Sequence, residues 1–530
     1  MANDSSGSPR SKRRVRWPVA VGILVAGGAL VGALQLPELF KTDAERYLAT
    51  MGASLLTGGA LAFWAIFLTG FDWPTRRRLM LGCAGLLAAL ILLVRIDELS
   101  GNMVPRLAWR WSAKPDQTLL ESLRRSEKPE EAAAVDLANT SDHDFPQFLG
   151  KNRDGRLSGP ALARDWQAQP PRELWRQPIG AGWSAFAVVG DFAVTQEQRG
   201  PQELITCYEL HTGRLRWSHA DETRYSSTIA GDGPRATPTV DRGRVYALGA
   251  SGNFVCLDGA TGNVLWQHDL VAEHHAPLPQ WGISCSPLVI EDRVVVSAGG
   301  PKGHSLVAYD CESGELAWHA GDRQASYASP VLATLVDTPQ ILVVNQDSVA
   351  AHAPDDGRVL WTFAWPGGEP KVSNPAPIAP DRLFIAAGYG LGCKLLQLRQ
   401  SGDGAISVEK EPLWENRLLK PKFTNVIVRG DAVYGLDDGR ALVCLSLADG
   451  KRRWRGGRYG HGQLLLVDDL LLVQSEAGEV AQVEATPERF HELTRFQALE
   501  GKTWNTPALA GRLLLVRNAT EAACFELPVE

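Results

Sequence analysis

From about residue 144 to Glu530, the chain consists of short apolar runs separated by polar turns. The run Phe254–Leu257 is typical: the turn Asp258–Gly262 follows it, and a second short run then ends at Trp266. Valine, leucine and aromatic residues favour strands, whereas Asp, Thr and Gly favour a tight turn with left-handed backbone. The region shows no long amphipathic helical pattern, so it predicts an all-β domain built from hairpins.

This hairpin is repeated along the chain, and most copies end in tryptophan. The tryptophans follow one another at intervals of 40 to 53 residues: Trp175, Trp217, Trp266, Trp318, Trp361, Trp414 and Trp454. In five copies a glycine stands four residues before the tryptophan: Gly213, Gly262, Gly314, Gly357 and Gly450. A self-similar unit of about 40–50 residues is typical of β-propeller blades. We interpret the tryptophans as packing between neighbouring blades, because a large apolar ring can fill the gap between two sheets.

The repeat predicts an eight-bladed β-propeller of four-stranded blades. Six blades end at the tryptophans from Trp217 to Trp454, and a seventh ends near residues 490–496 without its tryptophan. The C-terminal residues 507–527 supply only three strands of an eighth blade. The segment Arg172–Trp175 is available as the missing outer strand. Its pairing with the C-terminal strands would close the ring and protect the open sheet edge.

Three uncharged apolar runs lie ahead of the β-rich region, within residues 17–96. We expect them to form transmembrane helices at about residues 17–36, 52–71 and 79–95. The first run could instead be a cleaved signal peptide, since it follows basic residues, but its length and the two further runs favour an uncleaved anchor. Residues 97–143 are charged and rich in alanine, which predicts a tether to the propeller at residues 144–530.

The distribution of basic residues indicates an orientation. They crowd residues 1–16 and the loop that contains Arg76–Arg78, whereas the loop at residues 37–51 is less basic. The positive-inside rule therefore places the basic N-terminal tail in the cytoplasm. Three crossings would put the propeller on the periplasmic side of the inner (cytoplasmic) membrane. Basic residues just beyond the third run oppose this orientation.

Composition limits the function classes further. The net charge of −6 over 530 residues disfavours a nucleic-acid partner, which usually requires a basic face. The eight cysteines include no CxxC motif and no adjacent pair, which disfavours covalent haem and a two-cysteine-pair zinc site. No metal site is predicted. His274 and His275 are adjacent, and on an extended segment adjacent side chains point to opposite sides.

The loops before the inner strands carry the candidate binding residues. Most inner strands open with a small residue and proline, as in Thr237-Pro238. An aromatic or cationic residue stands at a comparable place in each of the eight blades: Trp183, Arg235, Trp281, Tyr327, Lys371, Lys422, His461 and Trp504. Blade symmetry would gather them around one mouth of the central channel, where they suit a planar, anionic or peptide-like ligand. The alternative is that these side chains only fill the rim of the channel.

The strand–turn–Gly-x-x-x-Trp units resemble the pyrroloquinoline-quinone-like (PQQ-like) β-propeller repeat family over roughly residues 144–530. The segment Phe145–Gly150 is also similar to the W-P-Q-F-R-G lead-in of membrane-associated bacterial members, although Phe145 and Leu149 depart from it. The resemblance implies one of two functions. Some members are quinoprotein dehydrogenases that hold the quinone and Ca²⁺ in the funnel and use an aspartate base. Others are scaffolds without a cofactor, like the propeller lipoprotein of the outer-membrane-protein assembly complex.

Departures from the dehydrogenase pattern favour a scaffold. The adjacent cysteine pair and the haem motif are missing from the sequence. The aspartates that can be placed fall in outer hairpin turns, so no catalytic residue or calcium ligand is assigned. We therefore expect a membrane-anchored, extracytoplasmic propeller that binds a protein, peptide or polymer and has no cofactor. The alternative is a dehydrogenase of alcohols or sugars that depends on PQQ and Ca²⁺.

Overall fold

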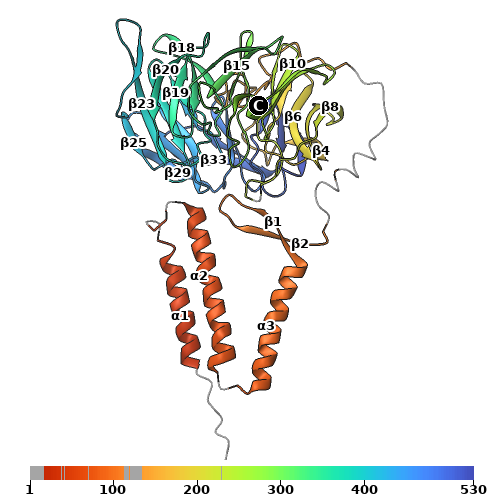
Figure 1. Ribbon diagram of the computed structural model, residues 1–530, viewed down its shortest axis with the longest axis vertical. Helices are drawn as coiled ribbons and strands as arrows, with labels where there is room; N and C mark the ends of the chain where they lie inside the picture. Colours follow the sequence, from red (N-terminus) through yellow and green to blue (C-terminus); the bar gives the residue numbers. More distant parts are fainter. Residues whose placement is uncertain are drawn as a thin grey trace, which may run out of the picture. The chain divides into compact units, whose positions relative to one another are not determined.

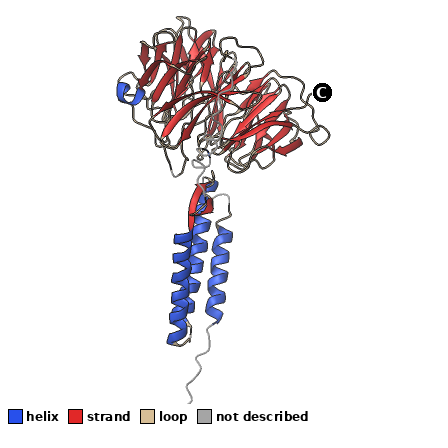
Figure 2. Ribbon diagram, turned by 90° about the vertical axis from the view of Figure 1, so that its right-hand side faces the viewer, coloured by secondary structure: helices blue, strands red, loops and turns tan. Residues whose placement is uncertain are grey.

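The computed structural model describes residues 17–36, 39–40, 42–69, 71–112, 119, 134–227 and 229–530. The chain divides into two compact units, Met1–Ser112 and Ala113–Glu530. Helices dominate the described part of the first unit and strands dominate that of the second, as Figures 1 and 2 show. The basic tail predicted at residues 1–16 lies outside the described residues.

The first unit contains three helices and a π-helical turn in its described residues: α1 (Trp17–Ala33), α2 (Asp43–Phe63), η1 (Trp64–Leu68) and α3 (Trp73–Leu93). A capping box starts α2, in which the Thr42 hydroxyl accepts from the Glu45 amide at 3.2 Å and the Glu45 carboxylate accepts from the Thr42 amide at 3.3 Å. The rings of Trp17 and Trp64 lie 5.7 Å apart, so α1 packs beside the end of α2.

Among the described residues, one helix is long and apolar enough to cross a membrane by length and composition, namely the 26 residues of Asp43–Leu68. The helix α1 is apolar but has 17 residues. The helix α3 includes Arg76–Arg78 in its first two turns, and its remaining uncharged stretch is shorter than the roughly 20 residues that a crossing requires. This finding favours a membrane anchor and leaves the three-span topology as a proposal.

Part of the predicted tether has regular structure. The strand β1 (Val94–Leu99) pairs antiparallel with β2 (Pro105–Trp109) in the first unit. Near the end of the predicted tether, Val135 and Leu137 are buried in the hydrophobic core shared by the first two blades. Residues 113–118 and 120–133 lie outside the described part of the chain.

Within residues 134–227 and 229–530, the structure describes eight sheets of four or five strands each. Blade 1 contains β5 (Ala187–Val189), β6 (Phe192–Arg199), β7 (Gln202–Glu209) and β8 (Leu215–Asp221). Blade 2 contains β9 (Thr239–Asp241), β10 (Arg244–Leu248), β11 (Asn253–Asp258) and β12 (Val264–Asp269). Blade 3 contains β13 (Leu288–Ile290), β14 (Arg293–Ser297), β15 (Leu306–Asp310) and β16 (Leu316–Ala320). Blade 4 contains β17 (Val331–Leu335), β18 (Thr338–Val344), β19 (Ser348–His352) and β20 (Val359–Ala364).

The remaining four blades follow the same antiparallel order. Blade 5 contains β21 (Ala376–Ile378), β22 (Arg382–Ala387), β23 (Gly392–Gln400), β25 (Trp414–Asn416) and an extra strand, β24 (Ile406–Val408). Blade 6 contains β26 (Ile427–Arg429), β27 (Ala432–Asp437), β28 (Ala441–Ser446) and β29 (Arg452–Gly456). Blade 7 contains β30 (Gln463–Val467), β31 (Leu470–Gln474), β32 (Glu479–Glu484), β33 (Glu492–Gln497) and the added parallel strand β3 (Arg156–Leu157). Blade 8 contains β34 (Ala508–Ala510), β35 (Leu513–Arg517), β36 (Glu521–Glu526) and β4 (Arg172–Pro178).

The first strand of each blade is the innermost one, because several of these first strands contact the first strand of the next blade, as β5 contacts both β9 and β34. The protein is thus an eight-bladed β-propeller, as the repeat predicts. Blade 8 also closes as predicted. The strand β4 pairs antiparallel with β36, and Trp175 lies opposite Cys524.

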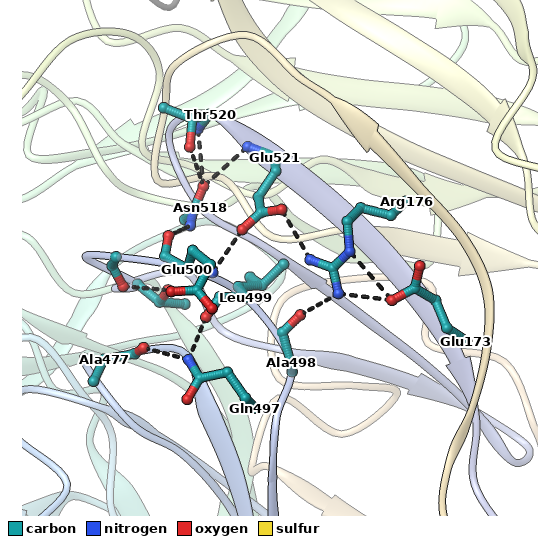
Figure 3. A network of polar contacts seen from close by, with 12 residues as sticks. Glu173, Arg176, Ala477, Gln497, Ala498, Leu499, Glu500, Asn518, Thr520 and Glu521 are labelled. Atoms are coloured by element: carbon teal, nitrogen blue, oxygen red, sulfur yellow. Dashed lines mark hydrogen bonds and ion pairs between the residues drawn. The ribbon is translucent and has the colours of Figure 1, made fainter.

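Polar contacts reinforce this closing strand. Figure 3 shows Arg176 of β4 between two carboxylates: its guanidinium lies 2.7 Å from Glu173 and 2.8 Å from Glu521. The same side chain donates to the Ala498 carbonyl at 2.8 Å, beyond the end of blade 7. The strand β4 is therefore held by blade 8, which it completes, and by the end of blade 7.

The repeated tryptophans pack between blades. A Cβ atom added to Gly213, which has φ +72°, would lie 2.7 Å from the ring of Trp175. Gly262, Gly314, Gly357 and Gly450 meet the tryptophan of the preceding blade in the same way. The Trp175 indole also donates to the Leu210 carbonyl of blade 1 at 2.8 Å. The predicted packing role is confirmed, and the glycine is required both by its left-handed backbone and by the ring that covers it.

The seam between blades 4 and 5 is built differently. The Trp361 indole donates to Gln340 Oε1 of its own blade at 2.7 Å, not to the turn of the next blade. The outer turn of blade 5 has no matching glycine, and the chain forms β24 there instead. Ile406 and Val408 of β24 pack against the core that contains Trp361. A longer connection thus replaces the usual contact between tryptophan and glycine.

A buried charge cluster crosses the closing seam. Arg517 of blade 8 donates to Thr195 Oγ1 at 2.8 Å and to the Gln196 carbonyl at 2.9 Å in blade 1. Next to them, Glu197 accepts from Arg199 at 2.8 Å and from the Tyr208 hydroxyl at 2.6 Å. Burial alone would raise the pKa of Glu197, but the charge of Arg199 and these hydrogen bonds outweigh it and lower the pKa from 4.5 to about 2.

The central channel contains residues 143–157 of the chain itself. The backbone of Phe145 pairs with blade 1, and the amides of Val240 and Gly511 donate to the segment from blades 2 and 8. Arg153 donates to two carbonyls just before β13 of blade 3, and β3 pairs with blade 7. Inner strands of blades 4, 5 and 6 line a cavity together with this segment. Only a position on the axis lets one segment lie beside all eight blades.

Substitution of Gly213 by alanine should separate the two requirements on this glycine. Gly511 has φ +55° with nothing within 4 Å of an added Cβ, whereas an added Cβ at Gly213 meets Trp175. Both variants bear the cost of left-handed backbone, about 1–3 kcal/mol. We expect Gly213→Ala to lose about 1–3 kcal/mol more, because it also overpacks the seam. Urea unfolding of both variants measures the difference, and equal losses would contradict the packing role.

Glu197 should make the propeller sensitive to acid. Because its pKa in the folded protein is below the ordinary value, its contribution is present above about pH 5 and is lost as the pH falls towards 2. The lowering corresponds to about 3 kcal/mol. We expect Glu197→Gln to be less stable than the parent at pH 7, yet to change less between pH 5 and pH 3. Denaturant unfolding across this range tests the expectation, and parallel pH profiles would refute it.

Candidate functional site

The eight predicted residues lie where the repeat places them. Each stands two to seven residues before the inner strand of its blade, at the same end of the propeller. Neighbours meet in pairs: the rings of Trp183 and Trp504 are 4.9 Å apart, and those of Trp281 and Tyr327 are 5.6 Å apart. Arg235 joins the second pair, since its Nε donates to the Trp281 carbonyl at 2.8 Å.

Several of these side chains are more buried than a solvent-exposed rim would require. Lys371, His461 and Lys422 have exposed fractions of 0%, 2% and 5%. The Lys371 ammonium donates to the Gly367 carbonyl at 3.3 Å and lies 5.4 Å from the Trp365 ring. Burial lowers the pKa of Lys371. These three residues are therefore part of the folded loop structure, which the sequence pattern did not indicate.

The structure adds residues that the sequence analysis missed. Tyr389, in the turn between β22 and β23, stacks on Trp281 at 6.1 Å. Phe423 lies 4.6 Å from the Trp504 ring, and Lys502 lies 4.4 Å above the same ring. The turns between the second and third strands point to the same end of the propeller as the predicted loops. That rule of blade geometry is the signal that could have found Tyr389.

Together these side chains form a continuous cluster, which we call the mouth cluster. From Trp183 of blade 1, contacts run through Trp504 of blade 8 to Phe423 of blade 6. The Lys422 ammonium lies 5.4 Å from the Phe423 ring and 5.0 Å from the Tyr389 ring of blade 5. Blades 1 and 5 stand opposite each other in a ring of eight, so the mouth cluster reaches across the channel.

A cavity of about 390 Å³ opens beside the mouth cluster, over blades 3, 4 and 5. Trp281, Tyr327 and Tyr389 provide aromatic faces, while Gln324 and Glu369 provide an amide and a carboxylate. Three prolines and two further glutamines complete much of the lining. Glutamine amides can both donate and accept hydrogen bonds, as peptide groups do, and aromatic faces pack on apolar or proline side chains. The cavity thus combines the features that hold an extended peptide.

The described residues do not supply the ligand cluster that Ca²⁺ requires. Among them, no group of three or more His, Cys, Asp or Glu side chains is arranged to hold a metal ion, whereas Ca²⁺ requires six to eight oxygen ligands, many of them carboxylate. Glu476, an acidic residue in the mouth, accepts from the Trp504 indole at 3.0 Å and from the His461 amide at 3.1 Å. Asp258 and Asp310 accept from their own turn residues, as expected for Asx turns.

A family model described as outer membrane protein assembly factor BamB matches residues 201–455 and 345–488. The chain belongs to this family of PQQ-like β-propellers. The matched region covers blades 2 to 6 entirely, together with the outer two strands of blade 1 and β30–β32 of blade 7.

Individual relatives match shorter segments. A quinohemoprotein alcohol dehydrogenase, ADH-IIG of Pseudomonas putida, is 29% identical over 151 residues, which are 27% of this chain and 20% of that protein. The outer membrane protein assembly factor BamB of Moranella endobia is 22% identical over 202 residues, 35% of this chain and 44% of that protein. The chain therefore spans less than half the length of these curated relatives.

Solved structures share the fold. The quinohemoprotein alcohol dehydrogenase of Comamonas testosteroni superposes with a TM-score of 0.54 at 13% identity, covering 78% of this chain and 84% of that one. The ADHIIG structure from Pseudomonas putida gives a TM-score of 0.52 at 13% identity, covering 75% and 83%. At this identity the likeness concerns the fold alone.

Proposed function

We propose that the propeller is a binding scaffold for a protein partner and holds an extended segment of that partner at the mouth. The cavity of about 390 Å³ beside the mouth cluster carries this proposal. Its aromatic, proline and glutamine lining suits a peptide with an apolar or proline anchor. The family description, which names an assembly factor, agrees with a protein partner.

The charges at the mouth bear on the kind of segment bound. Lys422 and Lys502 each lie within about 5 Å of aromatic rings, and Arg235 lies 4.5 Å from the Tyr225 ring. Cations over aromatic faces keep their charge while being partly desolvated. An extended segment with acidic residues next to its apolar anchor would fit this arrangement, because its carboxylates would pair with the lysines of the mouth cluster.

We also propose the membrane layout that the apolar helices suggest. The basic tail at residues 1–16 would lie in the cytoplasm, three spans near α1, α2 and α3 would cross the inner membrane, and the propeller would face the periplasm. Asp43–Leu68 supports one crossing by its length and composition. The arginines of α3 would lie at the cytoplasmic boundary, where basic residues are favoured.

The second candidate function is a PQQ-dependent alcohol or sugar dehydrogenase, which the match to a quinohemoprotein alcohol dehydrogenase favours. The poor fit of the mouth residues to Ca²⁺ and the mutual contacts of the mouth rings weigh against it. Reconstitution of the full chain with PQQ and Ca²⁺, followed by a dye-linked assay with simple alcohols and aldoses, separates the two functions. Turnover in that assay would overturn the scaffold proposal.

A photo-reactive residue in place of Gln324 should capture the partner. Gln324 is exposed and lines the cavity, whereas Arg358 is an exposed residue of the turn between β19 and β20, at the opposite end of the blade. We expect irradiation of membranes to give one discrete protein adduct from position 324 and none from position 358. Equal adducts at both positions would contradict binding at the mouth.

The same adduct should depend on Trp281. An aromatic residue at the centre of an interface contributes about 2 kcal/mol or more, on the order of thirty-fold in affinity. We expect Trp281→Leu to weaken capture by about that factor while the thermal midpoint shows that the propeller remains folded. Undiminished capture by a folded variant would place the partner elsewhere.

The proposed topology predicts the behaviour of a reporter fusion. Alkaline phosphatase fused after Glu530 should be active in a Gram-negative host, because it folds only on the periplasmic side. A reporter that works only in the cytoplasm should be inactive at the same position. The reverse pattern would overturn the layout without affecting the proposed mouth.

A further inference from the structure

A cluster of histidines lies between blades 2 and 3, apart from the mouth cluster. His274 ends the short helix α5 (Leu270–His274), and His304 lies in the loop between β14 and β15. Their Nδ1 atoms are 2.9 Å apart. The extended backbone expected at His274 and His275 is wrong, because α5 turns His274 inwards to 4% exposure and leaves His275 exposed as its left-handed cap.

Hydrogen bonds engage both nitrogens of the His274 ring. Its Nε2 lies 2.6 Å from the Tyr309 hydroxyl, and its Nδ1 lies 2.9 Å from Nδ1 of His304. A hydroxyl both donates and accepts. When Tyr309 accepts from His274 Nε2–H, the lone pair of His274 lies on Nδ1 and faces His304, which donates its own Nδ1–H to it.

We propose that His274 and His304 bind one divalent transition-metal ion of the zinc and copper class through their Nδ1 atoms. Nitrogen ligands about 2.05 Å from such an ion lie about 2.9 Å apart at a right angle and about 3.3 Å apart at the tetrahedral angle. The observed separation of 2.9 Å is thus already that of two neighbouring ligands. On binding, His304 moves its proton from Nδ1 to Nε2, so both rings stay neutral. Solvent completes the coordination.

The surroundings support an ion at this place. Metal-bound imidazoles commonly donate their other N–H to an acceptor that fixes the ring, and the Tyr309 hydroxyl, 2.6 Å from Nε2, stands in that position for His274. His304 is half-buried on a glycine-containing loop at residues 299–304, which gives solvent access and room for the small opening required.

Titration of the full chain with Cu²⁺ and with Zn²⁺ tests the site. Calorimetry should find one ion per chain, and the Cu²⁺ electron paramagnetic resonance spectrum should show two coupled nitrogens. His304→Gln is the deciding variant because His304 is half-buried, whereas His274 is buried and its loss also affects packing. We expect His304→Gln to abolish binding and Tyr309→Phe to weaken it by about 10–100-fold, the usual effect of losing such a partner.

His319 supplies the matched control. Its ring stacks on His304 at 4.0 Å, but its own Nδ1 is engaged with the Gly303 carbonyl at 3.0 Å. We therefore expect His319→Gln to bind the ion as the parent does. Binding that survives in His304→Gln, or that is absent from the parent, would overturn the site. Neither result would bear on partner capture at the mouth.

Discussion

The contact between a tryptophan of one blade and a glycine turn of the next is the constraint on which most of the ring depends. It sets the distance between neighbouring sheets, and five seams use it with the same geometry. The indole adds a hydrogen bond to the neighbouring blade, as Trp217 does to the Gly259 carbonyl at 2.9 Å. Since a ring closes only when all its seams agree in angle and spacing, a shared contact of this kind makes eight unequal sequences compatible with one another.

This contact also explains why the propeller could be predicted from the sequence. Tryptophan fills the gap between two blades and glycine tolerates both the left-handed turn and the ring above it, so the pair recurs in the sequence at each seam of this kind. The position opposite tryptophan is small in most blades, as with Cys256 opposite Trp266 and Cys524 opposite Trp175. Strand β24 and the segment on the channel axis were not predicted, because they occur once each and depend on space left by other parts of the fold.

The mouth was predicted only in part, for a related reason. Blade symmetry gave the positions of Trp183 and Trp504, which do meet, but it could not give their surroundings. Lys371 has an exposed fraction of 0%, because loops of blade 4 surround it and supply the carbonyl groups that accept from its ammonium. Tyr389 was overlooked because one turn in one blade carries it. Histidines 274 and 304 are 30 residues apart, and nothing in a linear pattern joins a helix end to a later loop.

The channel segment and the closing strand have a consequence for biosynthesis. Both belong to residues 143–178, which leave the ribosome before any blade is complete, yet Arg172 pairs with Glu526, 354 residues later. Until that partner is made, the closing strand β4 has no sheet to join, and the incomplete ring exposes unpaired edges. Folding of this kind is slow, because the chain loses the entropy of closing a loop over this separation before most of the stabilising contacts form. The propeller thus becomes complete in one late step, and a chain stalled before blade 8 would present two open sheet edges to other proteins.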